Sequence, residues 1–168
     1  ISTYGSPRTY VRLVNDNGVM LIAALRRREL DFVVAAQPSP EEAADLMLQP
    51  LSSRQGCFLA RSGHPLLSKP DLTLDDIAAY PVISTSRFST AMPMVALASR
   101  RNREGNRPVP DVACESVEMM RKIAMATDHL LLAAVAACSE AVDRGELVPL
   151  PLVDSRLKVA FAVIGLQG

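Results

Sequence analysis

Residues 10–36 read YVRLVNDNGVMLIAALRRRELDFVVAA, and this stretch decides the fold class. Residues 10–14 alternate apolar and polar side chains, which predicts a strand. Asn17 and Gly18 follow in a turn, and residues 19–28 carry apolar side chains at helical spacing. Residues 32–36 form an apolar run of the kind buried in a parallel sheet. The stretch therefore predicts a strand–helix–strand unit.

The rest of the chain continues this alternation. Thr73 and Asp76 have the spacing of a capping box and predict the start of a short helix. Residues 116–144 fit either a helix–strand–helix or a nearly continuous helix, because periodicity alone does not separate the two. Together these segments predict an α/β protein with a mostly parallel sheet. Further strands are predicted at 47–51, 57–61, 81–83, 112–114, 147–152 and 157–164, and a further helix at 94–103.

Composition excludes several classes of protein. The 168 residues carry a formal net charge of zero, whereas a domain that grips DNA by itself normally has a basic excess. The longest apolar run, residues 130–138, is far shorter than the ~20 residues needed to span a bilayer. The three cysteines, Cys57, Cys114 and Cys138, lack metal-binding or disulfide spacing, so we expect reduced thiols and no metal or cofactor. A cytoplasmic location without membrane contact is the simplest expectation.

The sequence contains none of the common catalytic motifs GxGxxG, GxxxxGK[ST], GxSxG and HExxH. His64 and His129 are its only histidines, and both lie at predicted turns or junctions. For each histidine we expect a structural or solvated role rather than a role as a general base, because the sequence offers no partner residue for such chemistry. We therefore do not expect an enzyme.

Three segments resemble the effector-binding domain of LysR-type transcriptional regulators. Residues 25–34, LRRRELDFVV, are similar to the family's L-x-x-G-x-L-D-hydrophobic stretch, with Arg28 in place of the usual Gly. Residues 63–66 and 72–83, GHPL and LTLDDIAAYPVI, are similar to "HPL…LTLxDLAxYPxI". Residues 144–150, RGELVPL, match "G-x-L-V-x-L". Their shared order and spacing over residues 10–164 support the resemblance.

The resemblance implies two Rossmann-like subdomains joined by two crossover strands, a type II periplasmic-binding-protein-like fold. Subdomain I would comprise residues 1–61 and 158–168, and subdomain II residues 62–157. It also implies a sensor that binds a small-molecule effector in the cleft between them. DNA would be bound only through an N-terminal helix-turn-helix outside these residues, and the full-length protein would be a homo-oligomer. Two rivals share the architecture: an extracytoplasmic solute-binding protein and an enzyme.

The expected effector site lies where strands end and helices begin, because free N–H groups meet there. Asn17 and Gly18 follow the first strand, and Ser116 opens a later helix as a third candidate. The loop after the strand at 81–83 combines hydroxyls, a cation and an aromatic ring, which suits an organic anion. A capped surface loop with incidental polarity explains it equally well. The loop residues are Ser84, Thr85, Ser86, Arg87, Phe88 and Ser89.

Two features depart from the family pattern. The usual glycine motif is replaced by residues 126–129, Ala-Thr-Asp-His, which puts the geometry of that loop in question. The family also places its first strand between the strands predicted here at 10–14 and 32–36. We expect the sequence either to begin after that strand and its helix or to lack residues between them. In the first case, strands 10–14 and 32–36 would either pair directly or leave a vacancy that is unstable unless another chain fills it.

Overall fold

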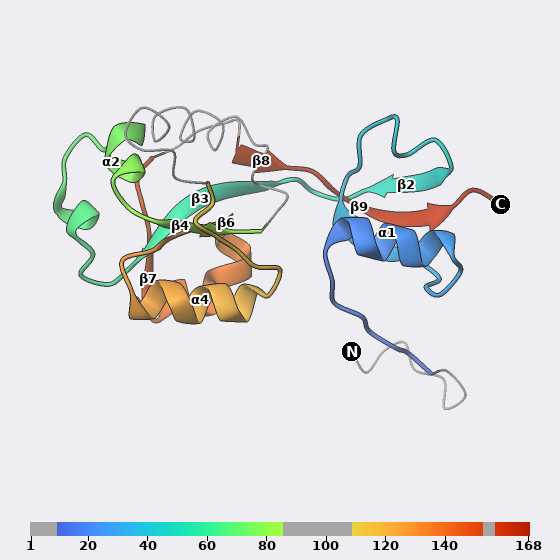
Figure 1. Ribbon diagram of the computed structural model, residues 1–168, viewed down its shortest axis with the longest axis horizontal. Helices are drawn as coiled ribbons and strands as arrows, with labels where there is room; N and C mark the ends of the chain where they lie inside the picture. The colour runs from blue at the N-terminus through green and yellow to red at the C-terminus, as the bar shows by residue number, and fades with distance from the viewer. Residues whose placement is uncertain (1–9, 86–108, 153–156) are drawn as a thin grey trace.

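The computed structural model describes residues 10–85, 109–152 and 157–168, and it forms two lobes (Figure 1). The small lobe is a three-stranded antiparallel sheet in the order β1-β9-β2. Helix α1 (Gly18–Arg26) packs on one face of this sheet. Its core holds Ile22 and Leu25 of the helix against Val33 and Ile164 of the sheet. The strands are β1 (Val33–Ala36), β2 (Leu46–Pro50) and β9 (Phe161–Leu166).

The large lobe is a six-stranded mixed sheet in the order β5-β4-β6-β3-β7, with β8 paired to β3. β4 is parallel to β5 and β6, whereas β3 is antiparallel to β6, β7 and β8. The strands are β3 (Arg54–Arg61), β4 (Val82–Ser84), β5 (Val112–Ala113), β6 (Leu130–Ala134), β7 (Leu147–Pro149) and β8 (Lys158–Val159).

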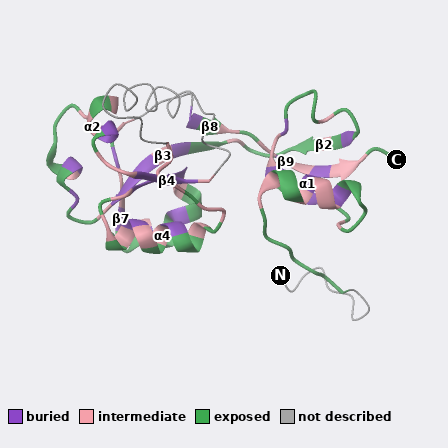
Figure 2. Ribbon diagram, in the orientation of Figure 1, coloured by how far each residue is buried: buried purple, intermediate pink, exposed green. Residues whose placement is uncertain are grey.

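Two apolar cores fill this lobe, and the most buried strands lie between them (Figure 2). One core joins Phe58 and Leu132 to the short helices η1 (Pro65–Ser68) and α2 (Leu74–Ala78). The other joins Ile83 and Leu131 to the longer α4. Strands buried in this way read as continuous apolar runs, which is why residues 130–133 contain no polar side chain. The remaining helices are α4 (Val117–Ala126), η3 (Val135–Cys138) and α5 (Ser139–Asp143).

The expected two-lobed α/β architecture is confirmed, and most predicted elements are present. Thr73 and Asp76 form the predicted capping box in both directions. Residues 116–144 form helix, strand and helices, so the continuous-helix alternative was wrong. The expectation of a mostly parallel sheet was also wrong, because both crossover strands enter their sheets antiparallel to their neighbours. The helix predicted at 94–103 lies outside the described residues.

The strand predicted at residues 10–14 does not form. These residues are exposed, with Tyr10 at 87% and Leu13 at 90%, and no strand pairs with them. A strand needs a neighbour to satisfy its N–H and C=O groups, and β1, the neighbour expected from the sequence, is paired only with β9 among the described residues. The alternating pattern of residues 10–14 therefore indicates strand propensity, but no neighbouring strand in the described residues pairs with this segment. Neither predicted arrangement of the two strands, paired or separated by a vacancy, is present.

Two crossover segments connect the sheets. β2 pairs with β9 in the small sheet and β3 pairs with β6 and β7 in the large sheet, so the first segment passes between the sheets from Pro50 to Arg54. The segment expected as one strand at 157–164 is divided between β8 and β9. β8 pairs with the start of β3, where Gln55 lies opposite Lys158, and the two crossover segments therefore lie side by side.

Helix α1 ends in a Schellman motif with an arginine in the left-handed position. The N–H groups of Arg28 and Glu29 donate to the carbonyls of Leu25 and Ala24, and Arg28 has φ 60°. Helix α5 ends in the same way, but Gly145, with φ 68°, takes the left-handed position. A left-handed backbone costs an L residue about 1–2 kcal/mol, and glycine avoids this cost. This cost explains why the family pattern has glycine at the position that Arg28 occupies here.

We expect Arg28→Gly to raise the free energy of unfolding by about 0.5–1 kcal/mol, after allowing for the extra chain entropy of glycine. The matched change Gly145→Ala should lower it by about 1 kcal/mol, because no atom lies within 4 Å of the added Cβ and only the backbone cost remains. Urea unfolding measures both. A loss of stability in Arg28→Gly would show that the arginine side chain makes a contact that outweighs its backbone strain.

Candidate functional site

A cleft of about 990 Å³ opens between the two lobes. The small lobe contributes the start of α1, the end of β1 and Phe161 of β9. The large lobe contributes Thr85 after β4, Glu115 and Val117 at the start of α4, and the end of β6. β8 crosses the junction with Lys158. The cleft is therefore formed by both lobes and by a segment that connects them.

Asn17 and Gly18 lie at the N-terminus of α1 and line the cleft, as the sequence predicted for an effector site. The Asn17 side chain accepts a hydrogen bond from the Met20 N–H at 2.9 Å and caps the helix. Asp16 accepts from the Asn17 N–H at 2.7 Å. The Asn17 side chain already uses one of its acceptor positions for this cap, and the positive end of the helix dipole still faces the cleft. The binding of a ligand by Asn17 and Gly18 remains a prediction.

The loop after β4 was the strongest candidate in the sequence. Thr85 lines the cleft. Ser84 is fully buried, and its hydroxyl donates to the Leu132 carbonyl at 3.4 Å, so it joins β4 to β6 and is not among the described cleft residues. Ser86, Arg87, Phe88 and Ser89 lie outside the described residues.

Ser116 caps α4, as its sequence position predicted. Its hydroxyl accepts a hydrogen bond from the Met119 N–H at 3.3 Å. The residues on either side of it, Glu115 and Val117, line the cleft, whereas Ser116 is not among the described lining residues. The sequence thus predicted that the N-terminus of α4 borders the cleft, although the neighbours of Ser116, and not Ser116 itself, line it among the described residues.

The apolar walls of the cleft were not recognised from the sequence. Met120, Leu132 and Ala133 line it from the large lobe, and all three are buried. Phe161 is the only aromatic side chain in the described lining. These residues belong to buried strands and helices whose apolar pattern is explained by core packing alone. Only the lobe arrangement shows that they also border a cleft.

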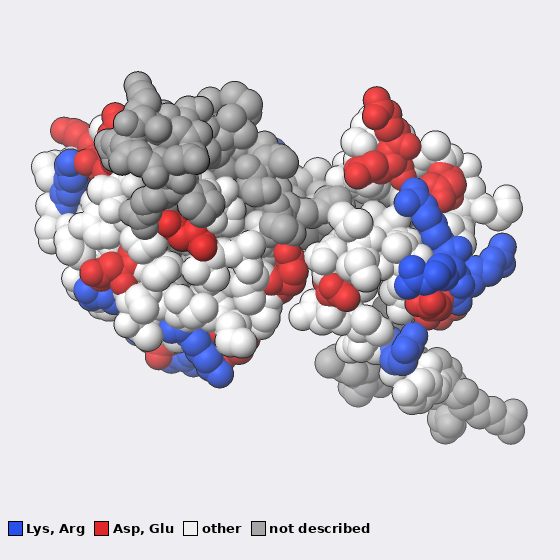
Figure 3. Space-filling model, in the orientation of Figure 1, with Lys and Arg blue, Asp and Glu red and all other residues white. Residues whose placement is uncertain are grey.

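The sequence patterns also did not predict which charged side chains line the cleft. Within the described lining, Asp16, Glu42 and Glu115 are acidic and Lys158 is the only cation. Figure 3 shows acidic side chains on both sides of the junction between the lobes. Lys158 lies on β8, where the resemblance implied a boundary between the two subdomains, and that position could have drawn attention to it.

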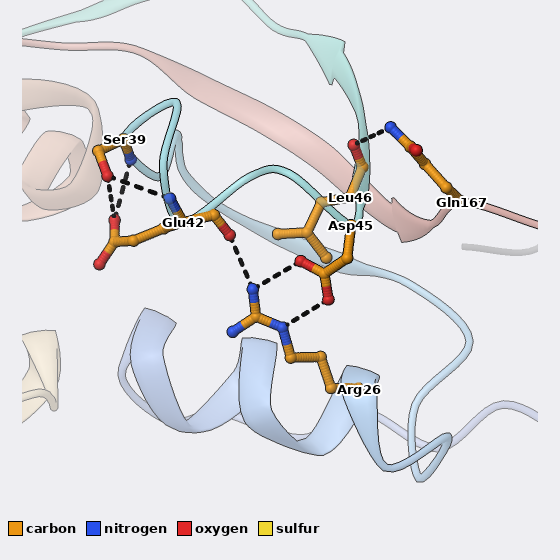
Figure 4. Close-up of polar contacts among 6 residues, drawn as sticks. All are labelled: Arg26, Ser39, Glu42, Asp45, Leu46 and Gln167. Atoms are coloured by element: carbon orange, nitrogen blue, oxygen red, sulfur yellow. Dashed lines mark hydrogen bonds and ion pairs between the residues drawn. The ribbon is translucent and has the colours of Figure 1, made fainter.

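Glu42 belongs to a loop that is fastened to α1 (Figure 4). Its side chain accepts hydrogen bonds from the N–H and hydroxyl of Ser39 at 2.9 and 3.1 Å. Arg26 donates to the Glu42 carbonyl at 2.7 Å and binds the carboxylate of Asp45 through two further hydrogen bonds. This ion pair is exposed, so we assign it a role in positioning the loop rather than in stability. It holds one edge of the cleft in place.

The histidines have structural partners. His64 is 1% exposed; its Nδ1 accepts from the Leu66 N–H at 3.2 Å and its ring packs on Tyr80 with centroids 4.6 Å apart. His129 Nδ1 lies 2.9 Å from the Thr127 hydroxyl. Neither is among the described residues of the cleft. The structural role expected for His64 is thus supported by its contacts.

The cysteines Cys57 and Cys138 are held as neutral thiols. Burial raises the pKa of Cys57 to about 11, and burial also raises the pKa of Cys138. Reactive cysteines have the opposite property, a lowered pKa that supplies thiolate at neutral pH. Within the described ranges, no group of three or more His, Cys, Asp or Glu side chains is arranged to hold a metal ion.

We expect the stability of this protein to fall on acidification through the titration of His64. Burial lowers the pKa of His64, and protonation would also remove the lone pair that accepts from Leu66. The unfolded chain then binds more protons than the folded chain, so the free energy of unfolding decreases as pH falls below the unfolded value of about 6.5. Unfolding by urea between about pH 7.5 and pH 5 measures this slope.

The matched variant is His64→Asn, which keeps an acceptor near the Leu66 N–H and does not titrate. Its stability should fall less steeply over the same pH range. Parallel curves for the two proteins would show that other groups cause the acid sensitivity.

No helix in the described part of the chain is long and apolar enough to cross a membrane. This finding agrees with the short apolar runs of the sequence.

Comparisons with known proteins place the chain in a family. The family model of the LysR substrate binding domain matches residues 6–168. The curated HTH-type transcriptional regulator PcaQ of Agrobacterium fabrum is 35% identical over 91 residues, which cover 54% of this chain and 28% of that relative. The matched region is thus well under half of the relative's length.

Solved structures show the same fold. OxyR of N. meningitidis in a reduced form has a TM-score of 0.73 at 14% identity, over 97% of this chain and 76% of that chain. The probable transcriptional regulator PA0477 of Pseudomonas aeruginosa has a TM-score of 0.69 at 20% identity, over 97% and 53%. The effector binding domain of QuiR in complex with shikimate has a TM-score of 0.65 at 16% identity, over 91% and 70%. With a family model that matches nearly its whole length, this chain belongs to the family of LysR substrate-binding domains.

Proposed function

We propose that this chain is the effector-sensing domain of a LysR-type transcriptional regulator. The observation that carries the proposal is a cleft bordered by the N-termini of two helices, α1 and α4, one from each lobe. The complete protein would act in the cytoplasm as a homo-oligomer and bind DNA through a separate domain. The family assignment favours this reading over a solute-binding protein or an enzyme, because LysR proteins are transcriptional regulators.

The chemistry of the cleft suggests a small organic acid that also carries hydroxyl or amino groups. Helix N-termini and Lys158 attract an anionic group. Asp16 and Glu115 are acceptors that suit ligand hydroxyls or amines and would repel a second carboxylate. Apolar side chains such as Met120 and Phe161 would cover the carbon skeleton. The predicted loop residues Ser86, Arg87, Phe88 and Ser89 follow Thr85 directly and belong to the same proposed site.

The lobes are joined where β3 and β8 run side by side, which makes this pair the natural hinge. Among the described residues, two backbone segments connect the lobes, so a change of lobe orientation needs few backbone rotations. An effector that contacts both walls binds the closed arrangement more tightly than the open one. That difference in affinity is what shifts the population towards closure. Closure would then alter how the attached DNA-binding domains are arranged.

A panel of small carboxylates, with shikimate included, tests the proposal by thermal unfolding. A ligand at about 100 times its dissociation constant should stabilise the protein by ~2.7 kcal/mol, which raises the melting temperature by roughly 5–10 °C. Each ligand that stabilises the protein is then incubated with it and analysed by mass spectrometry. Recovery of unchanged ligand supports a sensor, and formation of product would contradict it.

A further inference from the structure

Arg121 of α4 is a cation whose side chain is largely buried. This side chain is 15% exposed, against 68% for Lys122, the next residue along the helix. Both cations pair with the same carboxylate, that of Glu118, at 3.3 and 3.5 Å. The two residues therefore carry the same charge on the same helix and share one partner. Burial is what distinguishes them.

The guanidinium of Arg121 is incompletely paired within the described part of the chain. Its Nε is buried and makes no hydrogen bond there. Its ion pair with Glu118 contributes little, because that carboxylate is exposed and water screens it. A buried cation with a missing partner costs stability, and an apolar side chain in its place would avoid that cost. Core packing therefore gives no reason for an arginine at this position.

Arg121 lies one helical turn behind the wall of the effector cleft. Val117, four residues earlier on the same face of α4, lines the cleft, and so does Met120. A long side chain on a helix leans towards the helix N-terminus, and the contact of Arg121 with Glu118 has this direction. The N-terminus of α4 is the end that borders the cleft. The guanidinium is therefore directed towards the cleft from behind its apolar wall.

The helix η3 also places Arg121 close to the cleft. α4 packs against η3, and Ala137 of η3 lines the cleft. The next residue, Cys138, is fully buried, and burial raises the pKa of its thiol while the positive charge of Arg121 opposes that rise. The charge of the guanidinium therefore acts on groups in η3, one residue away from the lining of the cleft.

We propose that Arg121 is a specificity-determining residue of the cleft, a buried cation that favours anionic effectors without contacting them. This inference rests on the proposed sensor function, because it concerns the ligand of the same cleft. A charge acts more strongly through an apolar interior than through water, so the field of Arg121 crosses the thin wall of the cleft with little screening. Water and salt screen the exposed charge of Lys122. Of these two neighbouring cations, only Arg121 then influences the ligand.

The buried charge also helps to explain how this cleft can accept an anion. Its described lining holds three carboxylates and one cation, namely Asp16, Glu42, Glu115 and Lys158. This balance by itself disfavours an anionic ligand. Arg121 offsets part of it on the side of the large lobe. We therefore expect the anionic group of the effector near Val117 and Ala137, away from the acidic side chains of the small lobe.

A thiol placed in the cleft measures this preference without any effector. Ala137→Cys puts the thiol on an exposed lining residue. Its alkylation is followed with iodoacetate and with iodoacetamide, two reagents of similar size of which the first carries a carboxylate and the second a neutral amide. Mass spectrometry resolves the modified position, and the neighbouring Cys138 reacts slowly because burial raises its pKa. The ratio of the two rates reports the preference for an anion, because changes in thiol exposure or pKa affect both reagents alike.

We expect Arg121→Met to lower the ratio of the iodoacetate rate to the iodoacetamide rate about three- to tenfold, as the loss of a nearby, weakly screened charge implies. Arg121→Gln should have the same effect and serves as a second neutral variant. Arg121→Lys keeps the charge and should retain most of the ratio. Lys122→Met is the matched control and should leave the ratio unchanged.

Circular dichroism confirms that each variant is folded. A ratio that both neutral variants leave unchanged would overturn the proposal. So would an equal fall in Arg121→Lys, because the shape of arginine, and not its charge, would then be responsible. These measurements use no effector, so their failure is separate from that of the carboxylate panel, which bears on the sensor function itself.

Discussion

Replacing Phe58 with alanine is expected to lower the free energy of unfolding by about 3–5 kcal/mol, the range for large aromatic residues in a packed core. Phe58 is 0% exposed in the middle of β3, where it lies opposite Leu132 of β6. It also belongs to the core cluster that includes Ile77 and Leu150. The substitution removes a buried ring and leaves a cavity between the sheet and its covering helices. Urea unfolding should show a lower midpoint with an unchanged slope.

Phe32→Ala is the matched control for this change, because Phe32 is 63% exposed just before β1. Its effect should stay within about 0.5 kcal/mol. Equal losses in the two variants would mean that Phe58 does not occupy a packed core, and the assignment of β3 to the large sheet would then be wrong.

Removal of cationic groups from the proposed effector site should weaken the binding of an anionic ligand. Lys158 is the only cation in the described lining of the cleft, and Arg87 follows the lining residue Thr85 by two positions. Hydrogen bonds to charged groups contribute about 1.5–3 kcal/mol, so Lys158→Met and Arg87→Met should each raise the dissociation constant roughly 10- to 150-fold. Titration calorimetry with a ligand identified by thermal unfolding measures this change.

Lys122→Met provides the control, because Lys122 is exposed on α4, pairs with Glu118 and is not among the described residues of the cleft. Its affinity should match that of the natural sequence. If Lys158→Met and Arg87→Met also bind unchanged, the ligand is held without these cations and its proposed anionic character loses its support.

Local rules predicted most elements of this fold because their causes lie within a few residues. Thr73 and Asp76 cap a helix wherever they occur at this spacing, and the apolar run at 130–133 can only be buried. The segment 10–14 shows the limit of such rules. Its alternation is real, but a strand forms only when a neighbouring strand satisfies its backbone, and this condition is not local. For the same reason, periodicity could not predict that β3 enters the large sheet antiparallel.

The site was predicted only at its helix ends. Asn17 and Gly18 could be found because capping residues mark where a helix begins, and helix N-termini attract ligands. Ser84 has the right residue type and the right neighbours, yet it is buried and donates to the Leu132 carbonyl, because β4 is covered on both faces of the sheet. Lys158 and the apolar walls become part of a site only when the two lobes come together. That arrangement depends on the whole chain.

The most direct test of the sensor cleft is nuclear magnetic resonance of the amide groups during titration with a stabilising ligand. If the ligand binds between the lobes, the amides of Gly18 and Phe161 in the small lobe should shift together with those of Thr85 and Val117 in the large lobe. The same dissociation constant should describe all four. Shifts confined to one lobe, or to surfaces away from these residues, would contradict the account.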